Sequence, residues 1–161
     1  LFIVGGNPDG DAEVERLRGH AAALDIADRV VFPGAVPQTE LVRYYRAADA
    51  LVVTSRYESF GLAAVEALAC GTPVVASAVG GLTSIVRDRE NGLLVCWRKA
   101  DAFAGRLDEL LSDDELRARL AARARPSVER FSWRRIGDEV RAIYHELTAE
   151  QRVAVAACCC F

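Results

Sequence analysis

Residues 50–77 read ALVVTSRYESFGLAAVEALACGTPVVAS, and this stretch predicts one complete βαβ unit. A short, continuous apolar run over 50–53 is typical of a strand that is buried on both faces of a sheet. An apolar helix is predicted over 61–69, and the Gly-Thr-Pro that follows ends it. A second apolar run over 74–76 predicts the next strand. Because a helix joins them, the two strands run parallel and the connection between them is right-handed.

The same alternation of short apolar strands and amphipathic helices extends in both directions from this unit. Before it, strands are predicted over 1–4 and 30–32, and helices over 11–24 and 38–47. After it, the prediction is a short helix over 82–86, a strand over 93–95, and helices over 99–111, 113–124, 126–131 and 133–147. The pattern indicates an α/β fold: a Rossmann-like parallel sheet with helices on both faces, plus C-terminal helices. We expect one domain over residues 1–150 and a disordered, Cys-rich tail over 151–161.

Composition and charge exclude several classes of partner. Of the 161 residues, 52% are hydrophobic and 27% are charged, so the chain can bury a substantial core. The net charge is −3 and the arginines alternate with acids along the predicted helices, so we expect no nucleic-acid partner. No apolar run is long enough for a transmembrane helix. The cysteines have neither metal-ligand nor redox spacing, so we expect no metal and no cofactor.

Two features bear on the setting in which the protein works. Cys70 and Cys96 read as reduced, buried thiols, which favours the cytoplasm and leaves peripheral attachment to the inner membrane face open. The chain begins with the strand pattern LFIVGG and contains no Met, so we expect it to be a fragment of a longer protein.

Glycines and other small residues follow the predicted strands. They lie at Gly5 and Gly6, and within the stretches 33–35, 54–61 and 77–81. In an open parallel sheet the carboxyl ends of the strands form one edge, and ligands bind there. Glycine lets a backbone approach a ligand closely. The sequence therefore predicts a ligand site at this edge, where the glycine pair at 80–81 either contacts the ligand or only turns the chain.

Two glutamates bracket the start of the helix at Gly61, and their spacing suggests a ligand. The first N–H groups of a helix lack intrahelical partners and attract an anion such as a phosphate. Glu66 lies about 7 Å further along the helix, where the ribose of a bound nucleoside diphosphate would fall. Glu58 precedes the helix, on the side where a sugar on the far phosphate would lie. The pair therefore fits a nucleotide diphosphate sugar, with one acid for each sugar.

The motif that carries these residues, ESFGLAAVEALACGTPVVAS at 58–77, resembles the retaining glycosyltransferases of the GT-B fold, family 4. Further matches to that family are VGG, FPGAV, AADALVVTSRYESFGL, GG, NGLLV and FSW, so that the resemblance runs from Leu1 to about Leu147. The stretches PQTELVRYYRAADA and ACGTPVVASAVGGL are most similar to one branch of the family, the D-inositol-3-phosphate glycosyltransferases of mycothiol synthesis. The resemblance covers the C-terminal, donor-binding domain only.

The resemblance implies a role for each matched residue. Glu58 would be the residue of the catalytic centre, where it positions the donor sugar through its hydroxyls rather than acting as a nucleophile. Glu66 would bind the ribose. The donor sugar and diphosphate would contact Ser59, Phe60, Gly61, Leu62, Gly5 and Gly6. The loop against the base would be Pro33, Gly34, Ala35 and Val36.

The resemblance also implies an activity for the full-length parent. Such an enzyme moves a hexosyl group from a nucleotide diphosphate sugar, with a UDP-sugar favoured, to an acceptor hydroxyl. Family members carry an upstream Gly-Arg…Lys-Gly segment, which clamps the diphosphate, and an N-terminal domain that binds the acceptor. Neither is present in these residues. Since stabilising the departing diphosphate is a large catalytic term, we expect the fragment alone to bind the donor weakly and to be inactive.

Other interpretations stay open. The donor could be a GDP- or ADP-sugar, with a lipid-linked glycan or a sugar phosphate as acceptor. The chain could be a non-catalytic nucleotide-binding or scaffold module. A dinucleotide-binding oxidoreductase is disfavoured because GGNPDG supplies only part of a G-x-G-x-x-G motif. The aromatic residues Tyr44, Tyr45, Trp97, Trp133 and Tyr144 are interpreted as packing anchors.

Overall fold

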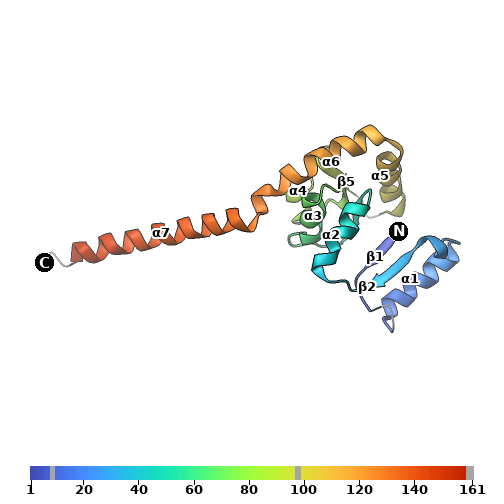
Figure 1. The fold of residues 1–161 in the computed structure, drawn as a ribbon, viewed down its shortest axis with the longest axis horizontal. Helices are drawn as coiled ribbons and strands as arrows, with labels where there is room; N and C mark the ends of the chain where they lie inside the picture. The colour runs from blue at the N-terminus through green and yellow to red at the C-terminus, as the bar shows by residue number, and fades with distance from the viewer. Residues whose placement is uncertain (8–9, 97–98, 159–161) are drawn as a thin grey trace. The chain divides into compact units, whose positions relative to one another are not determined.

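The computed structural model describes residues 1–7, 10–96 and 99–158, with side chains up to residue 148. The chain forms two compact units, an N-terminal unit over Leu1–Tyr44 and a C-terminal unit over Tyr45–Phe161. Figure 1 shows the ribbon coloured along the chain and labels α1 to α7, β1, β2 and β5.

The N-terminal unit is a small α/β element. It contains β1 (Phe2–Val4), α1 (Ala12–Ala23), the 3₁₀ turn η1 (Ala27–Arg29), β2 (Val31–Gly34) and most of α2 (Gln38–Ala47). The two strands pair in parallel, with Phe2 opposite Val31. Helix α1 begins where the side chain of Asp11 accepts a hydrogen bond from the backbone N–H of Glu13 at 2.9 Å, which caps the helix start.

The C-terminal unit is built around a three-stranded parallel sheet in the order β3-β4-β5. The strands are β3 (Leu51–Val53), β4 (Val74–Ser77) and β5 (Gly92–Val95). The helical elements are α3 (Leu62–Ala69), α4 (Leu82–Ile85), α5 (Ala100–Ser112), α6 (Asp114–Val128), η2 (Glu129–Phe131) and α7 (Trp133–Cys158). The central strand is buried along its whole length, as its continuous apolar run predicts.

Each face of this sheet has its own core. Val74 and Ala76 point into a cluster shared with α3, α4 and the end of α6. Val75, which alternates with them along the strand, points into a second cluster with α5 and the first half of α6.

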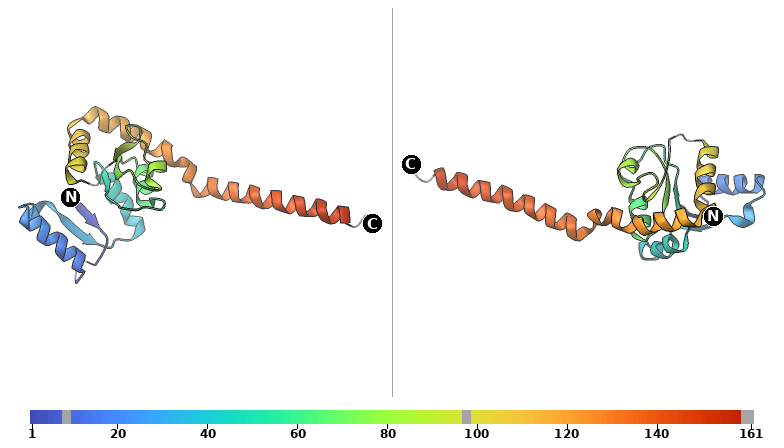
Figure 2. Two further views of the ribbon diagram at one scale, coloured as in Figure 1. Left: turned by 180° about the vertical axis from the view of Figure 1, so that it is seen from behind. Right: turned by 90° about the horizontal axis from the view of Figure 1, so that it is seen from above.

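Figure 2 shows two further views, in which α6 can be followed through η2 into α7. Helices on both faces of a parallel sheet confirm the predicted α/β fold class.

The C-terminal helices differ from the prediction in two places. Helix α6 continues through Pro126, where two separate helices were predicted. Pro126 removes the one N–H that would donate to the carbonyl oxygen of Ala122, but α6 ends only two residues later, at Val128. Helix α7 is assigned through Cys158, although a disordered tail was predicted from residue 151. Ala, Glu, Gln and Arg dominate 149–152, and these residues have high helix propensity, which favours continuation of the helix. The end of the tail, 159–161, lies outside the described residues.

The aromatic side chains of α7 do not anchor a core. Trp133 is 87% exposed and Tyr144 is also exposed, so the prediction that they are packing anchors is wrong in this structure. Tyr44 does pack, edge-to-face against Phe2 with ring centroids 5.9 Å apart. Trp97 lies outside the described residues. None of the described helices is both long enough and apolar enough to cross a membrane.

Candidate functional site

The start of α3 is open at the carboxyl edge of the three-stranded sheet. Gly61 occupies the N-cap position with a φ of 101°, which only glycine adopts without strain. A Cβ on Gly61 would also lie 2.9 Å from Cδ2 of Leu82. Within the described part of the chain no side chain caps this helix, and its first turn contains no acid. The positive end of the helix dipole is therefore available to an anion, as the sequence predicts.

The loop before Gly61 is supported by the glycine pair that follows β4. The backbone N–H of Gly81 donates to the carbonyl oxygen of Glu58 at 2.9 Å. A Cβ on Gly80 would overlap that same carbonyl oxygen, and one on Gly81 would overlap the backbone of Phe60. Close packing against this loop therefore requires glycine at both positions, and whether the pair also contacts the ligand stays a prediction.

Glu58 lies beside the helix start. Its Cγ is 3.7 Å from the position that a Cβ on Gly61 would take, and its side chain is half-buried. The ring of Phe60 packs edge-to-face on Phe131, with centroids 5.3 Å apart and an interplanar angle of 87°. Leu62 is 67% exposed at the first position of α3. The structure thus brings Glu58 to the open end of the helix, together with the predicted backbone donors around it.

Glu66 lies in the middle of α3 and is held by a residue that the sequence did not single out for function. The hydroxyl of Tyr45 donates a hydrogen bond of 3.0 Å to Oε2 of Glu66. The carbonyl oxygen of Tyr45 in turn accepts from Oγ1 of Thr72 at 2.6 Å. Burial, and then the hydrogen bond to Glu66, raise the pKa of Tyr45 above its ordinary value. The phenol therefore stays protonated and remains a hydrogen-bond donor at neutral pH.

In the N-terminal unit, the predicted site residues lie together at the ends of the two paired strands. The N–H of Gly5 donates to the carbonyl oxygen of Gly34 at 2.9 Å, at the ends of β1 and β2. Gly5, Gly6 and Gly34 all have positive φ angles, which explains why glycine stands at each position. The pair Gly5-Gly6 and the loop 33–36 are therefore adjacent within their own unit.

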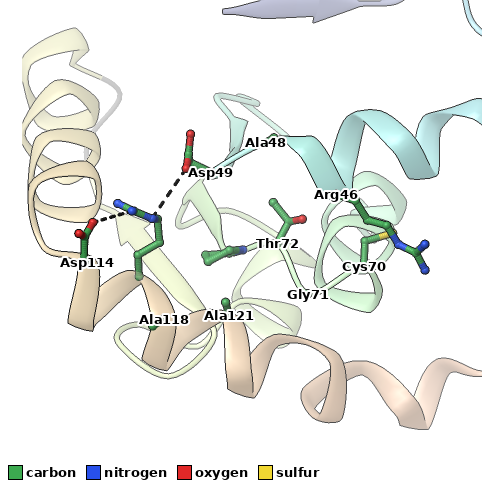
Figure 3. A pocket seen from close by; sticks show the side chains of 11 residues that line it. Arg46, Ala48, Asp49, Cys70, Gly71, Thr72, Asp114, Ala118 and Ala121 are labelled. Atoms are coloured by element: carbon green, nitrogen blue, oxygen red, sulfur yellow. Dashed lines mark hydrogen bonds and ion pairs between the residues drawn. The ribbon is translucent and has the colours of Figure 1, made fainter.

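A cavity of about 300 Å³ lies elsewhere in the C-terminal unit. Its lining residues come from the segments just before β3 and β4 and from the first half of α6, so it lies at the amino edge of the sheet rather than at the edge that carries Glu58. Figure 3 shows the ion pairs on one side of it, where Arg117 reaches Asp114 at 2.6 Å and Asp49 at 3.8 Å. This cavity contains none of the predicted site residues.

Comparisons with known proteins define the class to which the fold and the site belong. The chain belongs to the family of glycosyl transferases group 1, which matches residues 1–126. It is 47% identical to the D-inositol 3-phosphate glycosyltransferase of Acidothermus cellulolyticus over 156 residues, 96% of this chain and 34% of that protein. The enzyme of the same name from Frankia alni is 46% identical, with 96% of this chain and 38% of that protein covered. These findings confirm the predicted resemblance to the family and to that branch of it.

Solved structures of glycosyltransferases share the fold. Sucrose-phosphate synthase from Thermosynechococcus elongatus matches with a TM-score of 0.84 at 40% identity, over 93% of this chain and 39% of that one. Anabaena Alr3699/HepE, solved in complex with UDP, matches with a TM-score of 0.82 at 27% identity, over 90% of this chain and 40% of that one. The same Anabaena protein has also been solved in complex with UDP-glucose. The chain spans about a third of the length of the curated relatives it matches.

Proposed function

We propose that this chain is the donor-binding domain of a retaining glycosyltransferase that takes a hexosyl group from a UDP-sugar. The observation that carries the proposal is the open start of α3, with Gly61 at its N-cap and Glu58 beside it. Membership of the family supports the reaction class. The UDP and UDP-glucose complexes of the similar Anabaena protein support the donor.

In the proposed complex, the diphosphate lies on the first N–H groups of α3, where the helix dipole offsets its charge. Glu58 accepts hydrogen bonds from the donor sugar, and Ser59, Phe60, Gly61 and Leu62 supply nearby backbone. Glu66 accepts hydrogen bonds from the ribose hydroxyls. The roles of Gly5 and Gly6 in contacting the donor, and of the loop 33–36 in contacting the base, stay predictions.

The acceptor hydroxyl attacks the anomeric carbon from the face that the diphosphate leaves, so that the configuration is retained. A leaving-group oxygen takes the acceptor's proton, and Glu58 positions the sugar. In the proposed full-length enzyme the acceptor site belongs to an N-terminal domain, and the cationic clamp on the diphosphate is the Gly-Arg…Lys-Gly segment that the family carries upstream of the first strand. Among the described residues, the helix N-terminus is what offsets the charge of the diphosphate. The proposal therefore includes weak donor binding and no turnover by this chain alone. The predicted cytoplasmic location stays a prediction.

Calorimetric titration of the chain with UDP, UDP-glucose, GDP, ADP and NAD tests the proposal. We expect UDP and UDP-glucose to bind. At a ligand concentration one hundred times the Kd, the free energy of unfolding should rise by about 2.7 kcal/mol. Glu66→Ala should weaken both ligands about tenfold, because it removes hydrogen bonds to a charged group. Glu58→Ala should weaken UDP-glucose and leave UDP unchanged, because only the sugar contacts Glu58.

Glu115→Ala is the matched control, since Glu115 is an exposed acid in the first turn of α6. It should leave all affinities unchanged. Binding of NAD without binding of any nucleoside diphosphate would overturn the proposal in favour of a dinucleotide-binding domain. Binding of UDP with equal effects of Glu58→Ala on UDP and UDP-glucose would refute the role of Glu58. Donor binding without transfer by the full-length protein would indicate a non-catalytic module.

A further inference from the structure

We propose that Tyr45 is a positioning residue, which holds the carboxylate of Glu66 in place to receive the two hydroxyls of a ribose. The inference deepens the proposed function and rests on it. It makes Tyr45 a determinant of the preference for ribonucleotides over nucleotides that lack those hydroxyls.

The hydrogen bond between these two side chains lies within the C-terminal unit, where it joins the last turn of α2 to α3. Tyr45 belongs to the last turn of α2 and Glu66 to the middle of α3. The hydroxyl of Tyr45 reaches Oε2 of Glu66 at 3.0 Å, in a half-buried position. A hydrogen bond to a carboxylate is among the stronger ones that neutral donors make, and it is directional. It therefore selects one orientation of the Glu66 side chain.

Tyr45 is itself well fixed, which a positioning residue requires. Its ring packs against the buried cluster formed by α3, α4, β4 and the end of α6. Its carbonyl oxygen is bound by the hydroxyl of Thr72, a buried residue just before β4. Both ends of the residue are thus tied to the core of the unit, and only the hydroxyl faces Glu66.

The electrostatics agree with a donor role. A tyrosine phenol is protonated at neutral pH, and burial and the hydrogen bond to Glu66 raise the pKa of Tyr45 further, so Tyr45 acts as the donor in this pair. An ionised carboxylate has several acceptor positions and can receive hydrogen bonds from a phenol and from ribose hydroxyls together. A carboxylate that is already oriented loses less rotamer freedom when the ligand binds than a mobile one does.

A purely structural role predicts a different pattern of effects. If the hydrogen bond only joined α2 to α3, its loss would lower stability and affect every ligand equally. If it orients Glu66, its loss should matter only for ligands that engage Glu66. A ligand without ribose hydroxyls separates these two cases.

The experiment is calorimetric titration of the chain and its Tyr45→Phe variant with UDP and with 2′,3′-dideoxy-UDP. We expect Tyr45→Phe to raise the Kd for UDP about fivefold to tenfold, and to change the Kd for the dideoxy ligand less than twofold. In a Glu66→Ala background, Tyr45→Phe should have no further effect on UDP binding. Tyr44→Phe, which removes the hydroxyl of the neighbouring tyrosine packed on Phe2, should leave both Kd values unchanged.

The outcomes separate this inference from the function on which it rests. An unchanged Kd for UDP in Tyr45→Phe, or equal weakening of both ligands, would overturn the role of Tyr45 while leaving the nucleotide site intact. Thermal unfolding shows whether the Tyr45→Phe and Tyr45→His variants are folded. If both are folded, Tyr45→His, which restores a hydrogen-bond donor, should recover part of the UDP affinity that Tyr45→Phe loses. Failure of the unsubstituted chain to bind UDP would overturn both proposals.

Discussion

The backbone N–H of Gly81 donates a hydrogen bond of 2.9 Å to the carbonyl oxygen of Glu58. This contact joins the loop after β3 to the turn after β4 at the carboxyl edge of the sheet. The absence of a side chain on Gly80 and Gly81 is what allows the two backbones to approach. The position of Glu58 therefore depends on a turn that comes later in the chain, after α3 and β4.

Gly80→Ala tests this dependence. The new methyl group would overlap the carbonyl oxygen of Glu58, and Gly80 has a φ of 47°, where alanine is strained. We expect the free energy of unfolding to fall by about 2 kcal/mol or more, measured by urea denaturation.

Gly105→Ala is the matched control for that substitution. Gly105 lies inside α5, and a Cβ there would meet no atom within 4 Å. Because alanine has the higher helix propensity, the control should gain about 0.5–1 kcal/mol. Equal stability of Gly80→Ala and the unsubstituted chain would show that the two loops are not packed as described.

Adjacent leucines of α5 provide a second pair of variants. Leu110 is 0% exposed, in the core on the α5 face of the sheet, whereas Leu111 is 50% exposed. Leu110→Ala should lower the free energy of unfolding by about 2–5 kcal/mol, because it removes buried methyl groups and leaves a cavity. Leu111→Ala should cost less than about 1 kcal/mol. Similar losses in the two variants would contradict the assigned face of the helix.

The buried side chain of Asn91 connects three segments of the C-terminal unit. Its Oδ1 accepts from the N–H of Arg87 at 2.8 Å, and its Nδ2 donates to the carbonyl oxygen of Ile85 and to Oγ of Ser127. Asn91→Ala leaves these groups without their partner, so we expect a loss of about 2–4 kcal/mol in thermal or urea unfolding.

Ser127→Ala removes only one of these contacts. Nδ2 of Asn91 keeps its hydrogen bond to Ile85, so the loss should be about 1 kcal/mol. If Asn91→Ala cost no more than Ser127→Ala, the connecting role of Asn91 would be disproved.

Glu109 gives a prediction for pH dependence. Its hydrogen bond from Arg106 at 2.9 Å and its ion pair with Arg89 hold the pKa of this carboxyl below its ordinary value. Because the pKa of Glu109 is lower in the folded state, its ionised form stabilises the fold at pH values above the unfolded pKa near 4.5. That stabilisation is lost as the pH falls through the pKa of the folded state. Glu109→Gln should therefore cost up to about 1 kcal/mol at neutral pH, since the pair is partly exposed.

The same comparison under acid conditions supplies the check. At about pH 2.5, well below the unfolded pKa, much of this contribution should be lost, so the difference between the variant and the unsubstituted chain in urea denaturation should be smaller than at neutral pH. Glu115→Gln, at the exposed start of α6, is the control for loss of a carboxylate. A stability difference for Glu109→Gln that did not change between the two pH values would rule out the ionic contribution.

Much of the fold could be predicted because it is encoded locally. Short apolar runs, each ending at a polar or turn-forming residue, predicted β3 and β4 within one residue of their observed bounds. The exceptions are also physical: Pro126 indicated a helix break that did not occur, because the one hydrogen bond it removes lies in the last turn of α6. Reading Trp133 as a packing anchor was wrong, because hydrophobicity alone does not say what a side chain packs against.

The sequence by itself determined the alternation of strands and helices, the family, and the placing of Glu58 and Glu66 on either side of a helix start that requires glycine. All of these follow from residue types at short spacing along one chain. Only the tertiary structure decided that Tyr45 holds Glu66 and that Gly81 holds Glu58. Those partners come from different elements, and hydrogen bonds between elements exist only once the helices and turns have packed around a common core.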